Sequence, residues 1–578
     1  MPEIDLSMLQ EALTVHATQG RTALLPALQT AQNIFGYIPA PVATEVGRIL
    51  GVPLAEVYGV IDFYTMLYYQ PVGQRVLRVC TDPSCALGGG EVILADLCHH
   101  FDNTPGGTSA DGAITVERSP CLGLCDHAPA VLLDENPIGP IDPTKLENLL
   151  QADATRSGDV IGGTIRILTA HCGNETPTKL ANYEADGGYE ALKIALTSTP
   201  LSTIATVKTS GLVGRGGAAF PTGLKWESAA AAPGDTKYLV CNADESEPGT
   251  FKDRVLMEHD PHLVLEGMVI AAYATGAHQG YIYIRGEYPY VYQIMSAAVE
   301  DAQEAGYLGK NILGSGFDFD IELRLGAGAY ICGEETALFE SIEGRRGFPR
   351  IKPPFPTTHG LFGQPTVINN VETLCNVPYI LKHGAQAYRQ LGTQNSPGTK
   401  LFCLSGDIAH PGLYELPFGV TLRELLIDLG GGIRDDGSLQ AVLLGGAAGA
   451  FATPDHLDIP LSFEHLQAVG LQIGSGVVIV FDDTRDLGEV LMQLARFFVH
   501  ESCGQCFPCR IGTQQLCNLL TKINRGEGVL EDLEKMENLS DLLRTMSLCG
   551  LGQSAANPFL SALEYFRHEI ISLIENES

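Results

Sequence analysis

Two groups of cysteines have spacings suited to binding metal. The first consists of Cys80-x4-Cys85 followed by Cys121-x3-Cys125. Four thiolates brought together as two pairs form the ligand set of a [2Fe–2S] cluster. Structural zinc is the competing interpretation, because zinc-binding pairs are also separated by roughly two to four residues, although zinc ribbons usually have C-x2-C in both pairs. The spacing favours the cluster.

The second group is Cys503-x2-Cys506-x2-Cys509, followed at a distance by Cys549. Three cysteines in one turn with a remote fourth are a common arrangement for a [4Fe–4S] cluster. Zinc rarely uses three cysteines at this spacing, so this pattern is a strong indication of the cubane. Cys517 lies further along the same segment and is interpreted as a core residue on a helix face.

Residues 211–226 form a glycine-rich segment, G-L-V-G-R-G-G-A-A-F-P-T-G-L-K-W. Unhindered backbone amides at 214–217 can surround a phosphate, and Lys225 can neutralise it. The segment is not the dinucleotide fingerprint G-x-G-x-x-G. Most glycine loops are turns, so this one needs support from elsewhere in the chain.

Several polar segments supply that support. Residues 241–254 place Asp244, Glu245 and Glu247 close together, which taken alone favours an acidic surface turn. Residues 326–336 contain a second glycine loop with the paired carboxylates Glu334 and Glu335, which can accept hydrogen bonds from ribose hydroxyls. Further on, K-P-P-F-P at 352–356 offers a cation and an aromatic ring, and N-N-V-E-T at 369–373 offers amides and a hydroxyl.

The elements that must position these groups follow from periodicity. Apolar residues recur at helical spacing up to Pro71, and the pattern then alternates as in a strand at 75–80 and again from 114. A polar, glycine-containing connection at 151–163 is a plausible domain boundary. Beyond it we expect an α/β region, a compact α+β region with one helix near 422–429, and helices after Asp486.

Bulk properties exclude several classes of protein. The net charge of −32 argues against nucleic-acid binding, which needs lysine and arginine for phosphate contacts. No apolar stretch is long enough to cross a membrane, and the amino terminus lacks the features of a secretory signal, so we expect a cytoplasmic location without direct membrane insertion. In that compartment the 15 cysteines are metal ligands or core residues and not disulfides.

The motifs G-R-G-G-x-x-F-P, N-A-D-E-x-E-P-G, G-A-G-A-Y-I-C-G-E-E-T, K-P-P-F-P, N-N-V-E-T and E-S-C-G-x-C-x-P-C-R together resemble one family. Residues 170–575 resemble the flavoprotein subunit of NADH dehydrogenases, found in respiratory complex I, NAD-reducing hydrogenases and NAD-linked formate dehydrogenases. The first 150 residues resemble the small [2Fe–2S] subunit that accompanies it.

The resemblance implies a role for each matching residue. FMN would be bound by the backbone of Gly214, Arg215, Gly216 and Gly217 and by Lys225, Asn242, Asp244, Gly333, Asn369, Asn370 and Thr373. NADH would contact Phe220 and Phe355 at adenine, Glu334, Glu335 and Lys352 at the ribose and phosphates, and the candidate catalytic residues Glu247 and Tyr330 near the nicotinamide. The metal ligands would be Cys80, Cys85, Cys121 and Cys125 for [2Fe–2S], and Cys503, Cys506, Cys509 and Cys549 for [4Fe–4S].

The implied fold is multidomain α/β and α+β. Its expected parts are an N-terminal helical region (1–72), a thioredoxin-like [2Fe–2S] domain (73–155), a Rossmann-like FMN and NADH domain (165–395), a β-grasp insert (396–482) and a helical [4Fe–4S] domain (483–578). Two departures from the family pattern stand out. Ala219 replaces a usual glycine, and Ser228 stands where relatives often have a phenylalanine against adenine.

The implied activity is transfer of hydride between NAD(H) and FMN, with single electrons passed to iron–sulfur clusters. Because both modules occur on one chain, the pattern favours the diaphorase subunit of an NAD-reducing [NiFe] hydrogenase, with a further iron–sulfur subunit and hydrogenase subunits as partners. Complex I and formate dehydrogenase are the alternatives. A zinc-stapled scaffold and a degenerate nucleotide sensor are the rivals from other classes.

Overall fold

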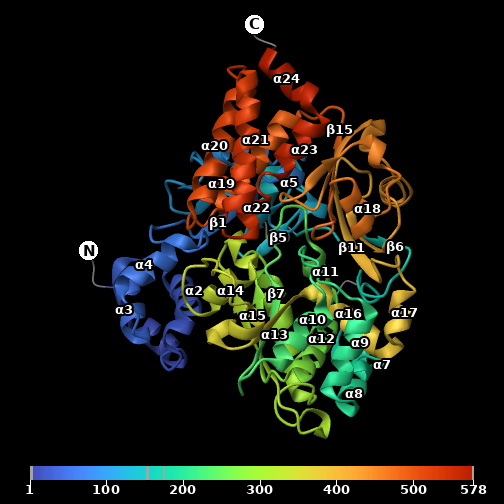
Figure 1. Cartoon of the computed structure of the whole chain (residues 1–578). Helices are drawn as coiled ribbons and strands as arrows, with labels where there is room; N and C mark the ends of the chain where they lie inside the picture. Colours follow the sequence, from blue (N-terminus) through green and yellow to red (C-terminus); the bar gives the residue numbers. More distant parts are fainter. Residues whose placement is uncertain (1–3, 151–154, 174–175, 576–578) are drawn as a thin grey trace.

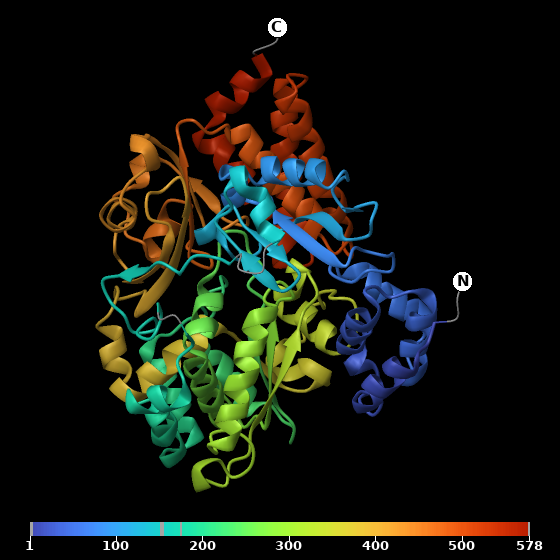
Figure 2. The same ribbon diagram turned by 180° about the vertical axis from the view of Figure 1, so that it is seen from behind.

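The computed structural model describes residues 4–150, 155–173 and 176–575. Figure 1 shows the N-terminal helices at one side of the molecule and the C-terminal helices at one end, with an α/β region at the opposite end. Figure 2, the view from behind, shows the five-stranded sheet next to the C-terminal helices. Among the described residues, no helix is both long and apolar enough to cross a membrane.

The N-terminal region is helical, as the periodicity predicts. Its helices are α1 (Ser7–Ala12), α2 (Leu24–Phe35), α3 (Ala40–Leu50) and α4 (Leu54–Phe63). Pro53 precedes the first residue of α4, where a fixed φ suits a helix start. After α4, Tyr64 donates a hydrogen bond from its hydroxyl to Ser341 Oγ at 2.6 Å, which attaches this region to the α/β part.

A five-stranded sheet contains the first pair of cysteine loops. Its order is β2 (Gly107–Thr108), β3 (Ile114–Ser119), β1 (Arg75–Cys80), β4 (Val131–Leu133) and β5 (Asn136–Ile138), with α5 (Pro83–Leu87) and α6 (Gly90–His100) following β1. Strands β1 and β3 are parallel, and Cys80 is in register with Ser119. The loops after these two strands therefore leave the same edge of the sheet.

A parallel four-stranded sheet forms the centre of the α/β part. Its order is β10 (Thr366–Asn370), β7 (Tyr238–Ala243), β8 (Gln279–Ile284) and β9 (Asp320–Leu325). The chain runs outward from β7 to β9 and then returns to the other side of β7 as β10. A ligand site is expected at such a reversal, beyond the carboxyl ends of the strands. Asn370 and Asn242 are in register there.

Helices surround this sheet on both faces. They are α7 (Leu180–Ala185), α8 (Glu190–Thr197), α9 (Pro200–Ser210), α10 (Thr222–Ala231), α11 (Lys252–His259), α12 (Pro261–Thr275), α13 (Pro289–Glu304), α14 (Glu335–Ile342), α15 (Pro356–His359), α16 (Val371–His383) and α17 (Ala385–Arg389). Helix α12 is buried almost all round and packs against α16 and β7. This explains its nearly continuous apolar sequence.

The α+β insert has a six-stranded sheet with one unexpected member. The order is β14 (Ala450–Ala452), β13 (Leu439–Leu444), β15 (Val477–Asp482), β11 (Thr399–Gly406), β12 (Gly412–Pro417) and β6 (Ile161–Gly163), with α18 (Phe463–Ala468) beside it. The predicted helix near 422–429 is a π-helix, Glu424–Leu429. Strand β6 comes from the segment predicted as a plain connection. A side chain at Gly163 would lie 2.1 Å from the Glu415 carbonyl oxygen, so glycine permits this pairing.

The chain ends in helices α19 (Leu487–Glu501), α20 (Phe507–Asn524), α21 (Leu530–Met546), α22 (Gly550–Ser554), α23 (Asn557–Tyr565) and α24 (Arg567–Glu575). Asp486 caps α19 by accepting a hydrogen bond from the Gly488 N–H. Cys503 and Cys506 lie in the turn between α19 and α20, Cys509 lies in the first turn of α20, and Cys549 follows α21. The division of the chain into five domains stays a prediction.

Candidate functional site

Two adjoining cavities of about 670 and 470 Å³ lie at the chain reversal between β7 and β10. Both are within the size range of roughly 300–1,000 Å³ usual for cofactor sites. They share lining residues from the ends of both strands, among them Asn242 and Asn370. The topology thus places the site where open α/β sheets bind nucleotides.

The structure brings together almost all of the predicted FMN and NADH residues. The larger cavity is lined by Gly214, Gly216, Phe220, Lys225, Asn242, Gly333, Glu334, Glu335, Lys352, Phe355, Asn369, Asn370 and Thr373. The smaller one is lined by Gly217, Asp244, Glu247 and Tyr330 in addition to shared residues. Arg215 lines neither cavity. Its side chain is buried against Tyr388 and the Phe418 ring, and its backbone N–H donates to Thr373 Oγ1.

Lys225 has the environment expected of a phosphate-binding residue. Its Nζ donates to the Ile368 carbonyl oxygen at 3.0 Å, the single hydrogen bond of this ammonium to another described residue. Burial lowers the pKa of Lys225. A phosphate would use the remaining N–H donors and stabilise the charge, so the residue fits the phosphate end of FMN.

The wall of the smaller cavity contains a buried polar atom that lacks a hydrogen-bond partner among the described residues. Asp244 Oδ2 is buried and has no hydrogen-bond partner among the described residues, and burial raises the pKa of this carboxyl well above its usual value. A Cβ at Gly333 would lie 3.2 Å from Asp244 Oδ2. Buried polar atoms are normally satisfied, so a ligand hydrogen bond at Asp244 completes the site.

The predicted ribose and phosphate residues form a tight ion-pair group. Lys352 Nζ lies 2.8 Å from Glu334 Oε1 and 2.6 Å from Glu335 Oε1. Burial alone would lower the pKa of Lys352, but attraction from Glu335 and Glu334 raises it. Glu334 also caps α14 by accepting from the Thr336 and Ala337 N–H groups. Glu334 therefore has a structural role of its own.

Two exposed aromatic rings mark the mouth of the larger cavity. Phe220 is 53% exposed and Phe355 is 58% exposed. Exposed rings on a cavity wall are suited to stacking on a base. Ser228 also lines this mouth, one helical turn after Leu224 on α10. No sequence motif marks Leu224, yet it supplies apolar surface next to the missing aromatic side chain.

Glu247 and Tyr330 are joined directly. The Tyr330 hydroxyl donates to Glu247 Oε2 at 2.5 Å, and the Ala448 N–H donates to Oε1 at 2.8 Å. Burial raises the pKa of Glu247 to about 7. A carboxyl with this pKa changes charge near neutral pH, and it would exert an electrostatic influence on a nicotinamide ring at the predicted position.

Several lining residues were missed by sequence reasoning. The smaller cavity is also lined by Ser246, Lys252, Gly445, Gln472, Ser475 and Gln553. Ser246 and Lys252 belong to the segment already noted for its carboxylates. The other four come from the α+β insert and the C-terminal helices, where no local motif marks them.

The first cysteine group is assembled at the edge of the five-stranded sheet. Cys80, Cys85, Cys121 and Cys125 are all buried. The sulfurs of Cys121 and Cys125 are 3.3 Å apart, and hydrogen bonds with Cys121 and Cys85 raise the pKa of Cys80 well above its usual value. Four sulfur atoms held together in two pairs form the ligand set of an iron–sulfur cluster, so the geometry fits one.

The second cysteine group is more open. Cys503, Cys506, Cys509 and Cys549 line one small cavity, and Cys509 alone among them is fully buried. Burial raises the pKa of Cys509 to about 12 and that of Cys549 to about 11. The convergence of the four cysteines on one cavity fits a [4Fe–4S] cluster.

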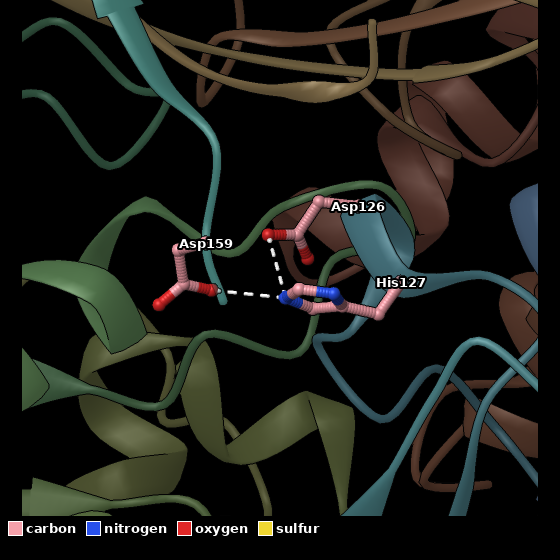
Figure 3. Close-up of side chains that lie close together, drawn as sticks. All are labelled: Asp126, His127 and Asp159. Carbon is pink, nitrogen blue, oxygen red and sulfur yellow. Dashed lines mark hydrogen bonds and ion pairs between the residues drawn. The ribbon is translucent and has the colours of Figure 1, made fainter. Parts of the chain in front are cut away.

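An acid–histidine group lies between the five-stranded sheet and α11. Figure 3 shows the His127 ring between Asp126 and Asp159, with His127 Nε2 3.3 and 3.0 Å from their carboxylates. Burial would raise the pKa of Asp159, but Arg254 and hydrogen bonds from His127 and His259 keep it well below its usual range. Since Arg254 already pairs with both carboxylates, this group is a salt-bridge network and not a metal site.

Comparison with known proteins gives three family matches. Residues 207–379 match the Nuo51 FMN-binding domain, residues 9–153 the thioredoxin-like [2Fe–2S] ferredoxin, and residues 489–572 the NADH-ubiquinone oxidoreductase-F iron–sulfur binding region.

Among curated proteins, the F 2 subunit of NADH-quinone oxidoreductase of Rhizobium meliloti is 49% identical, over 68% of this chain and 94% of its own length. The NADP-reducing hydrogenase subunit HndC of Solidesulfovibrio fructosivorans is 46% identical, over 72% of this chain and 84% of its own length.

Among solved structures, a crystal structure of NAD⁺-reducing [NiFe]-hydrogenase in the H₂-reduced state matches with a TM-score of 0.87 and 35% identity. The match covers 97% of this chain and 94% of the other.

Proposed function

The chain belongs to the family of flavoprotein subunits of complex I-type NADH dehydrogenases, and we propose that it is the diaphorase subunit of a cytoplasmic NAD-reducing [NiFe] hydrogenase. As a family member it is an NADH oxidoreductase with FMN, one [2Fe–2S] cluster and one [4Fe–4S] cluster as cofactors. The zinc-stapled scaffold interpretation is therefore wrong.

One observation carries the hydrogenase proposal. The hydrogenase structure aligns with 97% of the chain, including the N-terminal [2Fe–2S] part, whereas the curated sequence relatives, HndC among them, align with about 70% of it. A single chain with both modules matches that architecture from end to end. The alternatives are the NADH-input subunit of complex I and that of an NAD-linked formate dehydrogenase.

When bound, FMN would supply the exchange between a two-electron hydride and the single electrons that iron–sulfur clusters carry. The protein's own residues bind and orient. We propose that Lys225 and the amides of 214–217 hold the phosphate, that Phe220 and Phe355 hold the adenine, and that Glu247 lies near the nicotinamide. The eight cysteines Cys80, Cys85, Cys121, Cys125, Cys503, Cys506, Cys509 and Cys549 are the proposed cluster ligands.

We further propose that an iron–sulfur subunit docks at the [4Fe–4S] site. Phe507 directly follows Cys506, Met546 precedes Cys549 by three positions, and the two side chains are 66% and 65% exposed. Phe507 begins α20 and Met546 ends α21, and these two helices pack together near Gly512 and Leu543. Exposed apolar surface beside a cluster suits a protein partner that receives electrons from it.

The experiment is to purify the native complex through a tag on this chain and to measure anaerobic NAD⁺ reduction with hydrogen and, separately, with formate. Reduction driven by hydrogen supports the proposal, and NADP⁺ is tested in parallel. Reduction driven only by formate favours the formate dehydrogenase alternative. If neither donor works but NADH reduces quinone in membranes, the complex I alternative holds.

A further inference from the structure

Arg285 lies between the [2Fe–2S] cysteines and the flavin cavity. It follows β8 directly, and its side chain is almost completely buried. Nη2 donates to the carbonyl oxygen of Cys121 at 2.5 Å, and Nη1 donates to the carbonyl oxygen of Glu245 at 2.6 Å. Cys121 is a proposed cluster ligand, and Glu245 lines the smaller cavity. One guanidinium therefore bonds to the backbone of both sites.

The guanidinium is held in a single orientation. Its Nε lies 3.0 Å from Glu287 Oε2 and its Nη2 lies 2.9 Å from Glu287 Oε1. The Tyr288 ring centre is 5.1 Å from Cζ. A planar guanidinium whose orientation is fixed by a carboxylate loses little conformational entropy for each hydrogen bond that it donates.

The loop between Cys121 and Cys125 also lies close to Tyr288. A Cβ at Gly123, between Cys121 and Cys125, would lie 1.8 Å from the Tyr288 hydroxyl oxygen. That hydroxyl donates to Glu245 Oε2 at 3.3 Å. Because residue 123 is glycine, the loop between Cys121 and Cys125 can lie close to Tyr288, whose hydroxyl bonds to Glu245 in the wall of the flavin cavity.

A second buried arginine holds the same loop without reaching the flavin wall through its guanidinium. Arg254 Nε donates to the Gly123 carbonyl oxygen at 3.0 Å, and Nη2 bonds to both oxygens of Asp126. Its Nη1 pairs with Asp159, one of the residues in Figure 3. Arg254 therefore anchors the loop, and it supplies a matched comparison for Arg285.

We propose that Arg285 is a positioning residue that couples the [2Fe–2S] cluster to the flavin. Its positive charge lies in a low-dielectric region, where it stabilises an added electron on the cluster or on the flavin. Its two hydrogen bonds fix the backbone of a cluster ligand relative to the flavin wall, and hydrogen bonds around a cluster tune its potential. This inference rests on the cofactors of the family and not on the identity of the parent complex.

The test is a potentiometric titration of the purified complex, with the [2Fe–2S] signal followed by EPR and the flavin by absorbance. Arg285→Gln is expected to make the reduction potentials of both the cluster and the flavin more negative. The reduction equilibrium of the cluster should change by roughly tenfold, which corresponds to about 59 mV for a one-electron step. Glu287→Gln removes the counter-charge of Arg285 and is expected to move both potentials to more positive values. Arg254→Gln is expected to leave the flavin potential at its wild-type value.

A shift of the cluster potential alone in Arg285→Gln would overturn the coupling and leave Arg285 as a loop anchor. Unchanged potentials at both centres would overturn it as well. If Arg285→Gln yields no cofactor-loaded protein, the Glu287→Gln variant tests the proposal instead. An unchanged flavin potential in Glu287→Gln would contradict it. NADH-dependent ferricyanide reduction, measured in each sample, verifies that FMN is bound.

Discussion

At the proposed ribose end of the cavity, one lysine faces two carboxylates. Lys352 forms ion pairs with both Glu334 and Glu335, and Glu334 also accepts hydrogen bonds at the N-terminus of α14. Glu335 is therefore the carboxylate that can leave the ion pair for a ribose hydroxyl. Its charge would also repel the additional phosphate of NADPH, which makes it a candidate determinant of specificity.

We expect Glu335→Gln to raise kcat/KM for NADPH relative to NADH by about tenfold, or about 1.4 kcal/mol, because repulsion is removed and Lys352 gains a free donor. Steady-state ferricyanide reduction with each nucleotide measures this ratio. Glu340→Gln is the matched control, since Glu340 pairs with Arg350 and Arg345 away from the cavity lining. An unchanged ratio in Glu335→Gln would exclude this role.

The raised pKa of Glu247 predicts a pH effect. Burial brings the pKa of this carboxyl to about 7, so it is neutral below that pH and anionic above it. The anion stabilises the positively charged ring of NAD⁺ and not the neutral ring of NADH. Product inhibition by NAD⁺ should therefore strengthen as the pH rises from 6 to 8, on the order of a few-fold. Glu247→Gln should show constant inhibition, and an equal pH dependence in that variant would contradict the assignment.

At the scale of elements, strand ends and one helix face define the nucleotide site. Strands β7 and β10 bring Asn242 and Asn370 into register near their carboxyl ends, while α10 turns Leu224 and Ser228 toward the mouth of the cavity. Residues four apart lie on one face of a helix. The surface at the proposed adenine position is thus aliphatic at Leu224 and polar at Ser228, where Ser228 Oγ donates to Thr357 Oγ1 at 3.2 Å.

We expect Ser228→Phe to lower the KM for NADH by roughly two- to tenfold, because an added aromatic contact contributes about 0.5–1.5 kcal/mol. The kcat should stay near the wild-type value, since position 228 is at the mouth and not at the flavin wall. Ser228→Ala removes only the hydroxyl and serves as the control. A higher KM in Ser228→Phe would show that the ring blocks the entrance.

At the scale of the whole molecule, the two clusters differ in access to solvent. The four cysteines of the [2Fe–2S] site are buried between the five-stranded sheet and the α/β part. Three of the four [4Fe–4S] cysteines are partly exposed, beside the apolar surface formed by Phe507 and Met546. A docked partner would cover the exposed site, and the buried one needs no such cover.

We therefore expect the chain, once separated from its partner subunits, to lose its [4Fe–4S] cluster first on treatment with ferricyanide and a chelator. Iron should fall from about six to about two atoms per chain while the [2Fe–2S] EPR signal persists. The intact complex is the control and should retain both clusters for longer. Parallel loss of both signals would contradict the difference in protection.

The amino-acid sequence by itself was sufficient for the local chemistry. Cys503, Cys506 and Cys509 lie within seven residues, and their spacing alone indicates a [4Fe–4S] cluster. The glycine loop before Lys225 became a candidate phosphate site only together with the other motifs. The strand at Arg75–Cys80 and the helix after Asp486 were also predictable, because alternation and capping are short-range signals.

Only the tertiary structure decided which distant groups meet. Strand β6 joins a sheet whose other members lie more than two hundred residues away, and Gln472 and Gln553 reach the cavity from separate parts of the chain. Arg285 contacts Cys121 across 164 positions through a backbone carbonyl, which every residue type possesses. Such contacts leave no pattern in the local sequence, because they depend on how the packed parts come together and not on the residue types that make them.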